Sequence, residues 1–184
     1  MTSRSLPRPP LAALAELDQY TGRIPLATLG DWLARTELTE TDVRPFLRFS
    51  ADRYMRNLIY AGPAYQALVL CWRSGQRSPI HDHTGSSCGV KVISGVATET
   101  AFAAGPNGMV YALSSRHLPA GSTCASQDAD MHQMSNLQPE GEDLITLHIY
   151  SPALVYMNMY SIVAASVERF FDPINDEFVS GAGI

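Results

Sequence analysis

Two histidines separated by a single residue, His81 and His83, are the strongest chemical signal in the chain. Residues two apart share one face of a β-strand, whereas on an α-helix they point about 200° away from each other. The pair follows Pro79 and a strand-like apolar run, so a strand, or the entry into one, is the expected setting. Two imidazoles on one face suit Zn, Fe, Cu or Ni. The pair therefore predicts a metal site; two surface histidines on a loop are the alternative.

The residues around this pair stand at informative distances. Gly75 precedes His81 by six positions. Cys88 follows His83 by five positions, and Gly95 stands seven positions further on. This spacing resembles the first sequence motif of the cupins, Gly-x5-His-x-His-x4-Glu-x6-Gly, with Cys88 in place of the usual glutamate. The resemblance implies a small jelly-roll barrel that holds a metal ion.

A later stretch resembles the second cupin motif. Residues 119–121 read Pro-Ala-Gly, and His132 is followed by Asn136 after three residues; the gap between Gly121 and His132 is longer than in the common pattern. His132 is therefore the expected third ligand. Because Cys88 replaces a carboxylate, three neutral histidines would leave a divalent ion its full +2 charge and about three open positions, which favours anionic ligands such as thiolates. A metal-free cupin is the alternative.

Three stretches narrow the resemblance to one family. They are Cys71-Trp72 followed by His81-Asp82-His83-Thr84-Gly85-Ser86-Ser87-Cys88, then Tyr54-x-Arg56-Asn57-Leu58 upstream, and Leu147-His148-Ile149-Tyr150-Ser151-Pro152 downstream. Together and in this order, over roughly residues 53–152, they are similar to the cysteine dioxygenases. The resemblance implies Fe(II) bound by the three motif histidines, His81, His83 and His132. It also implies that Arg56 holds the substrate carboxylate and that Tyr54 helps to form that pocket.

The same resemblance implies roles for a strand near the end of the barrel. Tyr150 would place its hydroxyl near the iron, and Cys88 would be joined to Tyr150 by a thioether. His148 would connect Tyr150 with Thr146 in a hydrogen-bond relay, at a position where family members often carry serine. The residue pattern agrees independently, because Thr146, His148 and Tyr150 share one face of a strand. Three inward polar side chains are costly unless they bond to one another or serve a function.

The elements that must position these residues change character along the chain. Helical periodicity predicts helices over residues 11–20, 26–38 and 39–47, the last opened by a capping box from Thr39 to Asp42. Short β-branched and aromatic segments bounded by turn residues predict strands over residues 67–72, 88–93, 97–103, 109–113, 133–137, 144–150 and 155–161. The predicted fold is a mainly β cupin, one domain over residues 1–184. Its helical N-terminal layer covers about residues 11–50 and its barrel about residues 53–178, with fraying expected over residues 179–184.

Composition sets the broad class. The chain has 184 residues, 46% of them hydrophobic, and a formal net charge of −5. This excludes disorder for most of the chain and argues against binding to nucleic acid or acidic membranes. The three cysteines are too few for a disulfide scaffold, so we expect a reducing, cytoplasmic location, with Cys71 and Cys124 as buried thiols. We expect no signal peptide and no membrane span, an exposed His117, and a monomer as the working expectation.

The predicted function is the oxidation of L-cysteine by O2 to cysteine sulfinate, with Fe(2+) as cofactor. A dioxygenase of 3-mercaptopropionate or another small thiol acid is the nearest alternative. Relatives of that kind tend to carry glutamine at the position of Arg56 and glycine at that of Cys88, and both residues here argue against it. A non-catalytic cupin that senses a small ligand is the alternative from a different class. The ligand set by itself does not distinguish iron from other divalent ions.

Overall fold

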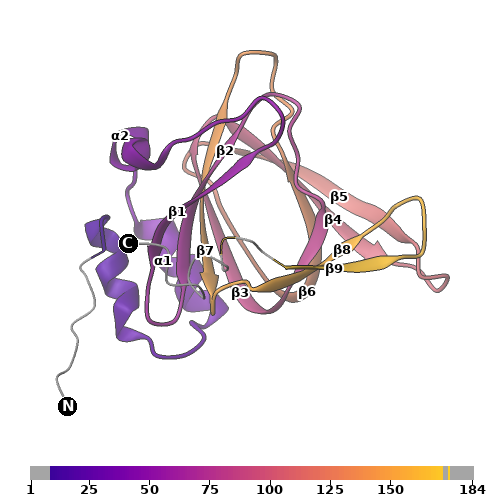
Figure 1. Ribbon diagram of the computed structural model, residues 1–184, viewed down its shortest axis with the longest axis horizontal. Helices are drawn as coiled ribbons and strands as arrows, with labels where there is room; N and C mark the ends of the chain where they lie inside the picture. The colour runs from indigo at the N-terminus through magenta and orange to yellow at the C-terminus, as the bar shows by residue number, and fades with distance from the viewer. Residues whose placement is uncertain (1–8, 172–173, 175–184) are drawn as a thin grey trace.

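Antiparallel strands coil into a barrel, and the N-terminal helical segments lie against one side of it (Figure 1). This computed structural model describes residues 9–171 and residue 174. The helical segments are η1 (Ala12–Gln19), α1 (Leu26–Arg35), α2 (Glu40–Val43) and η2 (Arg44–Phe46). The strands are β1 (Met55–Ala61), β2 (Gln66–Trp72), β3 (Ile80–Ser94), β4 (Val96–Ala104), β5 (Val110–Pro119), β6 (Thr123–Ser135), β7 (Leu144–Ser151), β8 (Tyr156–Tyr160) and β9 (Val167–Phe171).

The sheet places strands that are far apart in the sequence next to each other. Its order is β1-β2-β7-β3-β6-β4-β5, and β8 pairs with both β3 and β9. The two longest strands, β3 and β6, are neighbours and pair through a register with two irregularities. On its other edge β3 pairs with β7. The motif histidines and the Thr146–Tyr150 segment are therefore carried by three adjacent strands.

Two apolar cores lie on opposite sides of the central strands. Along β7, Leu147 and Ile149 pack with the helical layer, whereas Tyr150 packs inside the barrel. This alternation follows from the two-residue period of a strand. It directs Thr146 and His148 to the barrel interior as well, where they make buried side-chain hydrogen bonds. The interior of the barrel is thus the place where polar side chains of β7 gather.

The helical layer is attached directly to the strands that carry the histidines. Leu29 and Leu33 of α1 are fully buried and lie over Gly89 of β3, where an added Cβ would collide with Leu33 and approach Leu29 Cγ to 2.8 Å. Just before α1, Arg23 pairs with Asp128 of β6 at 2.8 Å, and its Nε donates to the Ser87 hydroxyl of β3 at 3.0 Å. The layer therefore holds β3 and β6 from outside the barrel.

The predicted mainly β fold with N-terminal helices is confirmed, with several changes in the bounds of its elements. The helix expected over residues 11–20 is a 3-10 helix, η1, and the helix expected over residues 26–38 ends at Arg35. The capping box at Thr39 is confirmed, since its backbone N–H donates to the Asp42 carboxylate at 2.8 Å. No helix in the described part of the chain is long and apolar enough to cross a membrane.

The strand predictions are correct for β2, β4, β7 and β8 to within one or two residues. Strands β3, β5 and β6 are longer than predicted, because cross-strand pairing extends them through polar residues that break the apolar pattern. Strands β1 and β9 were not among the predicted strands. The segment 179–184, expected to fray, and the last residues of the predicted barrel lie outside the described residues.

Candidate metal centre and its cavity

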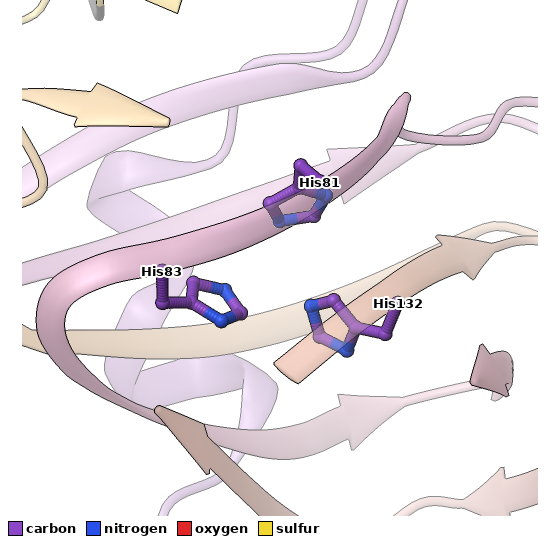
Figure 2. Close-up of side chains that lie close together, drawn as sticks. All are labelled: His81, His83 and His132. Atoms are coloured by element: carbon purple, nitrogen blue, oxygen red, sulfur yellow. The ribbon is translucent and has the colours of Figure 1, made fainter. Parts of the chain in front are cut away.

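Three buried histidines converge inside the barrel. His81 and His83 project from β3, and His132 projects from β6 directly opposite His81 in the strand register (Figure 2). Their candidate ligand nitrogens all lie within 4.8 Å of one another. The ring centroids are 4.8–5.0 Å apart. The structure therefore brings together all three histidines that the sequence motifs single out.

Each ring is oriented through its Nδ1 atom. The three contacts are His81 Nδ1 to the Pro79 carbonyl oxygen at 3.0 Å, His83 Nδ1 to Ser126 Oγ at 3.2 Å, and His132 Nδ1 to Glu99 Oε1 at 3.0 Å. Metal-binding histidines usually donate their second ring N–H to such an acceptor, which fixes the tautomer. The Nε2 atoms are then left to face the common centre.

A metal ion fits this arrangement. His83 Nε2 is buried and has no hydrogen-bond partner among the described residues. An unsatisfied buried polar atom costs about 1–3 kcal/mol. An ion at the centre of the three rings would remove that cost, and three imidazoles are a donor set that suits Zn, Fe, Cu or Ni. The cluster is therefore a candidate three-histidine metal site.

Burial keeps these rings in the form that binds metal. Burial, assisted by the neighbouring His132, lowers the pKa of His81 to about 3. The pKa of His83 is held well below its usual value, by burial first and then by the adjacent His81 and His132 rings. Both imidazoles are therefore neutral near neutral pH, and only an unprotonated nitrogen can donate its lone pair to an ion.

Sequence reasoning missed Glu99 and Ser126, which contact the ligand rings. Burial opposes ionisation of Glu99, but hydrogen bonds with His132 and Arg116 outweigh it and lower the pKa of the carboxyl to about 2. Glu99 stands in a segment predicted as a strand, between two threonines. An acidic residue within a strand indicates a buried partner of opposite polarity. That partner, His132, lies on β6, and only the pairing of β4 with β6 identifies it.

A continuous hydrogen-bond chain runs along the inner face of β7. Trp72 Nε1 donates to Thr146 Oγ1 at 3.0 Å, Thr146 Oγ1 lies 3.0 Å from His148 Nε2, and His148 Nδ1 lies 3.2 Å from the Tyr150 hydroxyl. An indole N–H can only donate, so Trp72 is the fixed donor at one end of the chain. Burial lowers the pKa of His148 well below its usual value. The neutral ring therefore carries one proton, and one of its two nitrogens donates while the other accepts.

Cys88 lies opposite Tyr150 in the register of β3 and β7 and is fully buried. Burial raises the pKa of the Cys88 thiol, against smaller opposing effects that include the charge of Arg56 and a hydrogen bond with Tyr150. The thiol is therefore protonated near neutral pH. The structure brings Cys88 and Tyr150 together, as the sequence leads one to expect.

Arg56 and Tyr54 lie beside the inner face of β7 and of β2. Arg56 Cζ lies 5.6 Å from the centroid of the Tyr150 ring, and Tyr54 stacks on Trp72 with ring centroids 4.2 Å apart. A small cavity separates them from the metal site. Its walls are formed by Tyr54, Arg56, Leu70, Trp72, Ser78, His81, Met134, His148, Tyr150 and Met157. A positively charged group, a phenol and a candidate metal ligand thus line one small cavity.

Comparison with known proteins agrees with this geometry. The family model described as cysteine dioxygenase type I matches residues 32–162. The chain is 34% identical to cysteine dioxygenase type 1 of Homo sapiens over 122 residues, which cover 63% of this chain and 60% of the human protein. It is 33% identical to cysteine dioxygenase type 1 of Danio rerio over 120 residues, 60% of this chain and 57% of that protein. The matches thus span less than two thirds of these relatives.

A solved structure supports the fold. A Klebsiella pneumoniae protein described as having a double-stranded β-helix domain superposes with a TM-score of 0.51 and 20% identity. The superposition covers 69% of this chain and 97% of the other. At that identity the likeness concerns the fold alone, and it agrees with the barrel of Figure 1.

Proposed function

This chain belongs to the cysteine dioxygenase type I family, and we propose that it oxidises L-cysteine with O2 to cysteine sulfinate. The observation that carries the proposal is the small cavity that Arg56, Tyr150 and His81 line together. In the reaction both oxygen atoms become bonded to the cysteine sulfur. The sulfur is oxidised and O2 is reduced, so no external reductant is needed.

The proposed cofactor is Fe(II), held by His81, His83 and His132. Fe(II) would supply open coordination positions for a thiolate and the redox chemistry that O2 requires. The protein's own contribution is a neutral ligand set, because a glutamate of the common cupin pattern is replaced by Cys88. The site therefore keeps a positive charge that attracts an anionic sulfur.

Arg56 is the proposed clamp for the substrate carboxylate. Guanidinium–carboxylate pairs are charge-assisted and can be bidentate, which fixes both position and orientation. The stacking of Tyr54 on Trp72 gives the same end of the cavity a rigid aromatic wall. A carboxylate held here would place the rest of a small amino acid toward the histidines. Orientation of this kind is a large part of catalysis by a confined site.

Tyr150 is the proposed hydrogen-bond donor to the reacting groups. The chain from Trp72 through Thr146 and His148 reaches the Tyr150 oxygen. In the tautomer that we propose, His148 donates from Nδ1 to this oxygen, and the phenol directs its own hydrogen to the reacting groups. Threonine replaces the serine common in the family and retains the hydroxyl that the relay needs. A fixed donor in a buried site stabilises developing negative charge without reorganising solvent.

We also propose a thioether between Cys88 and Tyr150. Their register across β3 and β7 and their shared burial support it. The sulfur would bond to a ring carbon, the thiol and the ring would each lose one hydrogen, and O2 would accept the two hydrogens. The bond would position the phenol and is not needed for the oxidation of substrate.

The test is oxygen uptake by protein that has been loaded with Fe(II) without air. We expect iron-dependent uptake with L-cysteine, and a sulfinate product that carries two 18O atoms when the gas is 18O2. His132→Ala should abolish it, whereas His117→Ala, at an exposed position outside the cavity, should not. Faster turnover of 3-mercaptopropionate than of L-cysteine would favour the other thiol dioxygenase. Thiol binding with no uptake for any small thiol would favour a sensor.

A further inference from the structure

The three candidate ligands do not have equivalent partners. His81 is held by a backbone carbonyl and His83 by a hydroxyl, and both partners are uncharged. His132 alone of the three is held by a carboxylate, that of Glu99, at 3.0 Å. A hydrogen bond to a charged acceptor is roughly twice as strong as one between neutral groups. The third ligand of the cluster in Figure 2 is thus the one with the strongest partner.

Both oxygens of the Glu99 carboxylate are used. Oε1 accepts from His132, and Oε2 accepts from Nε of Arg116 at 2.7 Å. Glu99 and Arg116 are direct partners in the register of β4 and β5, so the backbone itself fixes their approach. The Glu99 side chain is 10% exposed, whereas that of Arg116 is 60% exposed. The carboxylate is therefore buried beside the ligand, while its counter-charge lies in solvent, where it is largely screened.

The contact between Glu99 and His132 lines a different hollow from the proposed substrate cavity. A surface hollow is lined by Glu99, Arg116, Ser126, Asp130 and His132, among others. It shares none of its lining residues with the cavity that holds Arg56 and Tyr150. A change at Glu99 or Arg116 therefore acts on the metal ligand without touching the space proposed for the thiol.

We propose that Glu99, held in place by Arg116, is a positioning residue that supplies the metal centre with negative charge through His132. The carboxylate keeps the proton of His132 on Nδ1 and so directs the Nε2 lone pair to the ion. It also makes this imidazole a stronger donor than the other two. In the common cupin pattern a glutamate would bind the ion directly, and Cys88 has removed it. Here the carboxylate acts through the His132 ring and does not contact the ion, which leaves the coordination position open.

The inference rests on the proposed metal site, and it makes no use of cysteine oxidation. Removing an outer partner of a ligand typically costs 10–100-fold in metal affinity. A carboxylate partner should favour Fe(III) more than Fe(II), because it offsets the larger charge. Each tenfold loss of that preference corresponds to about 59 mV in a one-electron potential. Both quantities can be measured without any thiol.

The experiment compares Glu99→Gln, Arg116→Gln and a matched control, Glu16→Gln, with the wild type. Glu16 makes a similar two-contact pair with Arg35, but on the surface and outside the barrel. Fe(II) affinity is measured without air by competition with a chelator, and the Fe(III)/Fe(II) potential by redox titration. We expect Glu99→Gln to weaken Fe(II) binding by about 10–100-fold and to raise the potential. Arg116→Gln should shift both in the same direction by less, and Glu16→Gln should shift neither.

The outcomes of this experiment test whether the charge of Glu99 acts on the metal centre. Restored Fe(II) affinity and potential in Glu99→Asp, relative to Glu99→Gln, would support the role of the charge. Affinity and potential within twofold of the wild type in a folded Glu99→Gln protein would overturn the inference. If Glu99→Gln does not fold, the exposed Arg116→Gln variant decides, and unchanged values there would overturn it too. Normal metal binding by the wild type without sulfinate production would refute the proposed function and leave this inference standing.

Discussion

Arg56 is the residue on which substrate selectivity should depend. Arg56 lines the same cavity as His81, and its guanidinium lies over the Tyr150 ring. Losing one partner of a buried ion pair costs about 3–5 kcal/mol. We therefore expect Arg56→Ala to lower kcat/KM for L-cysteine by at least a hundredfold. Turnover of cysteamine, which has no carboxylate, should fall far less.

The measurement is kcat/KM for both thiols, with equal iron loading of the two proteins. Arg77→Ala, a change at an exposed arginine that does not line this cavity, serves as the control and should leave the ratio unchanged. An equal loss for the two thiols would show that Arg56 does not bind the carboxylate.

Cys88 should affect the rate without being essential. If the thioether only fixes the Tyr150 ring, its absence costs the ordering of one side chain, about 0.5–1.5 kcal/mol. Cys88→Ser should then lower kcat by up to about tenfold, and peptide mass spectrometry of the wild type should find a Cys88–Tyr150 peptide that lacks two hydrogens. Only unlinked peptides after long turnover with iron, cysteine and O2 would rule out the crosslink but not the dioxygenase.

Among single residues, the sequence predicted those of the candidate site that belong to recognisable motifs. The resemblance to the cupin motifs singled out His81, His83 and His132, which the structure brings together. The family resemblance singled out Thr146 and Tyr150, and the two-residue period of a strand placed them on one face, where His148 bridges them. Glu99 and Ser126 could not be assigned. Each reaches its histidine across a strand pairing, and the register of such a pairing is not encoded in the local sequence of either strand.

Among the elements, α1 and β3 are coupled through one glycine. Gly89 follows Cys88, and a Cβ at this position would collide with Leu33 and crowd Leu29 of α1. Overpacking of this kind typically costs about 1–3 kcal/mol. We therefore expect Gly89→Ala to lower the free energy of unfolding by that amount in urea denaturation.

Gly30 provides the matched control, because the same substitution there should have the opposite sign. Gly30 lies inside α1, and an added Cβ would meet no atom within 4 Å. Alanine is favoured over glycine inside a helix by about 0.5–1 kcal/mol, so Gly30→Ala should stabilise the protein. Destabilisation of equal size by both variants would show that the contact of α1 with β3 is not the cause.

The limits of prediction at this scale have a physical origin. Strands β2 and β7 were recognised because apolar residues make up one or both of their faces and every residue in them is buried. Most of β6 was missed, because much of it is polar and partly exposed, and its strand conformation comes from pairing with β3 and β4. Non-local pairing is a property of the assembled sheet and leaves little trace in local periodicity.

For the whole molecule, the barrel separates an inner polar site from an outer helical layer (Figure 1). The three cysteines are free and buried, in agreement with the expectation that no disulfide stabilises the fold. A cytoplasmic location, a monomer and the absence of nucleic-acid binding stay predictions from the composition. Buried neutral histidines are the feature that should dominate the response of the whole fold to pH.

The stability of the metal-free protein should fall as the pH drops below about 6.5. His81 has a pKa of about 3 when folded, and burial lowers the pKa of His83 and His148 in the same direction, whereas an unfolded histidine titrates near 6.5. Between these values the unfolded chain binds more protons than the native protein, so unfolding is favoured. Each such histidine removes about 1.4 kcal/mol per pH unit. Below about 4.5, Glu99 adds to the loss, because its folded pKa is about 2.

Urea unfolding of the metal-free protein at intervals from pH 7 to pH 4.5 tests this expectation. His148→Gln should reduce the slope of stability against pH, because one of the three protonation sites is gone and it is not a proposed metal ligand. His117→Gln, a change at an exposed histidine outside the barrel interior, serves as the matched control. A flat profile between pH 6.5 and 4.5 in the wild type would mean that the histidines are protonated inside the barrel. The cluster would then bind a metal ion less well below about pH 6.5, because an ion would have to displace those protons before it could bind.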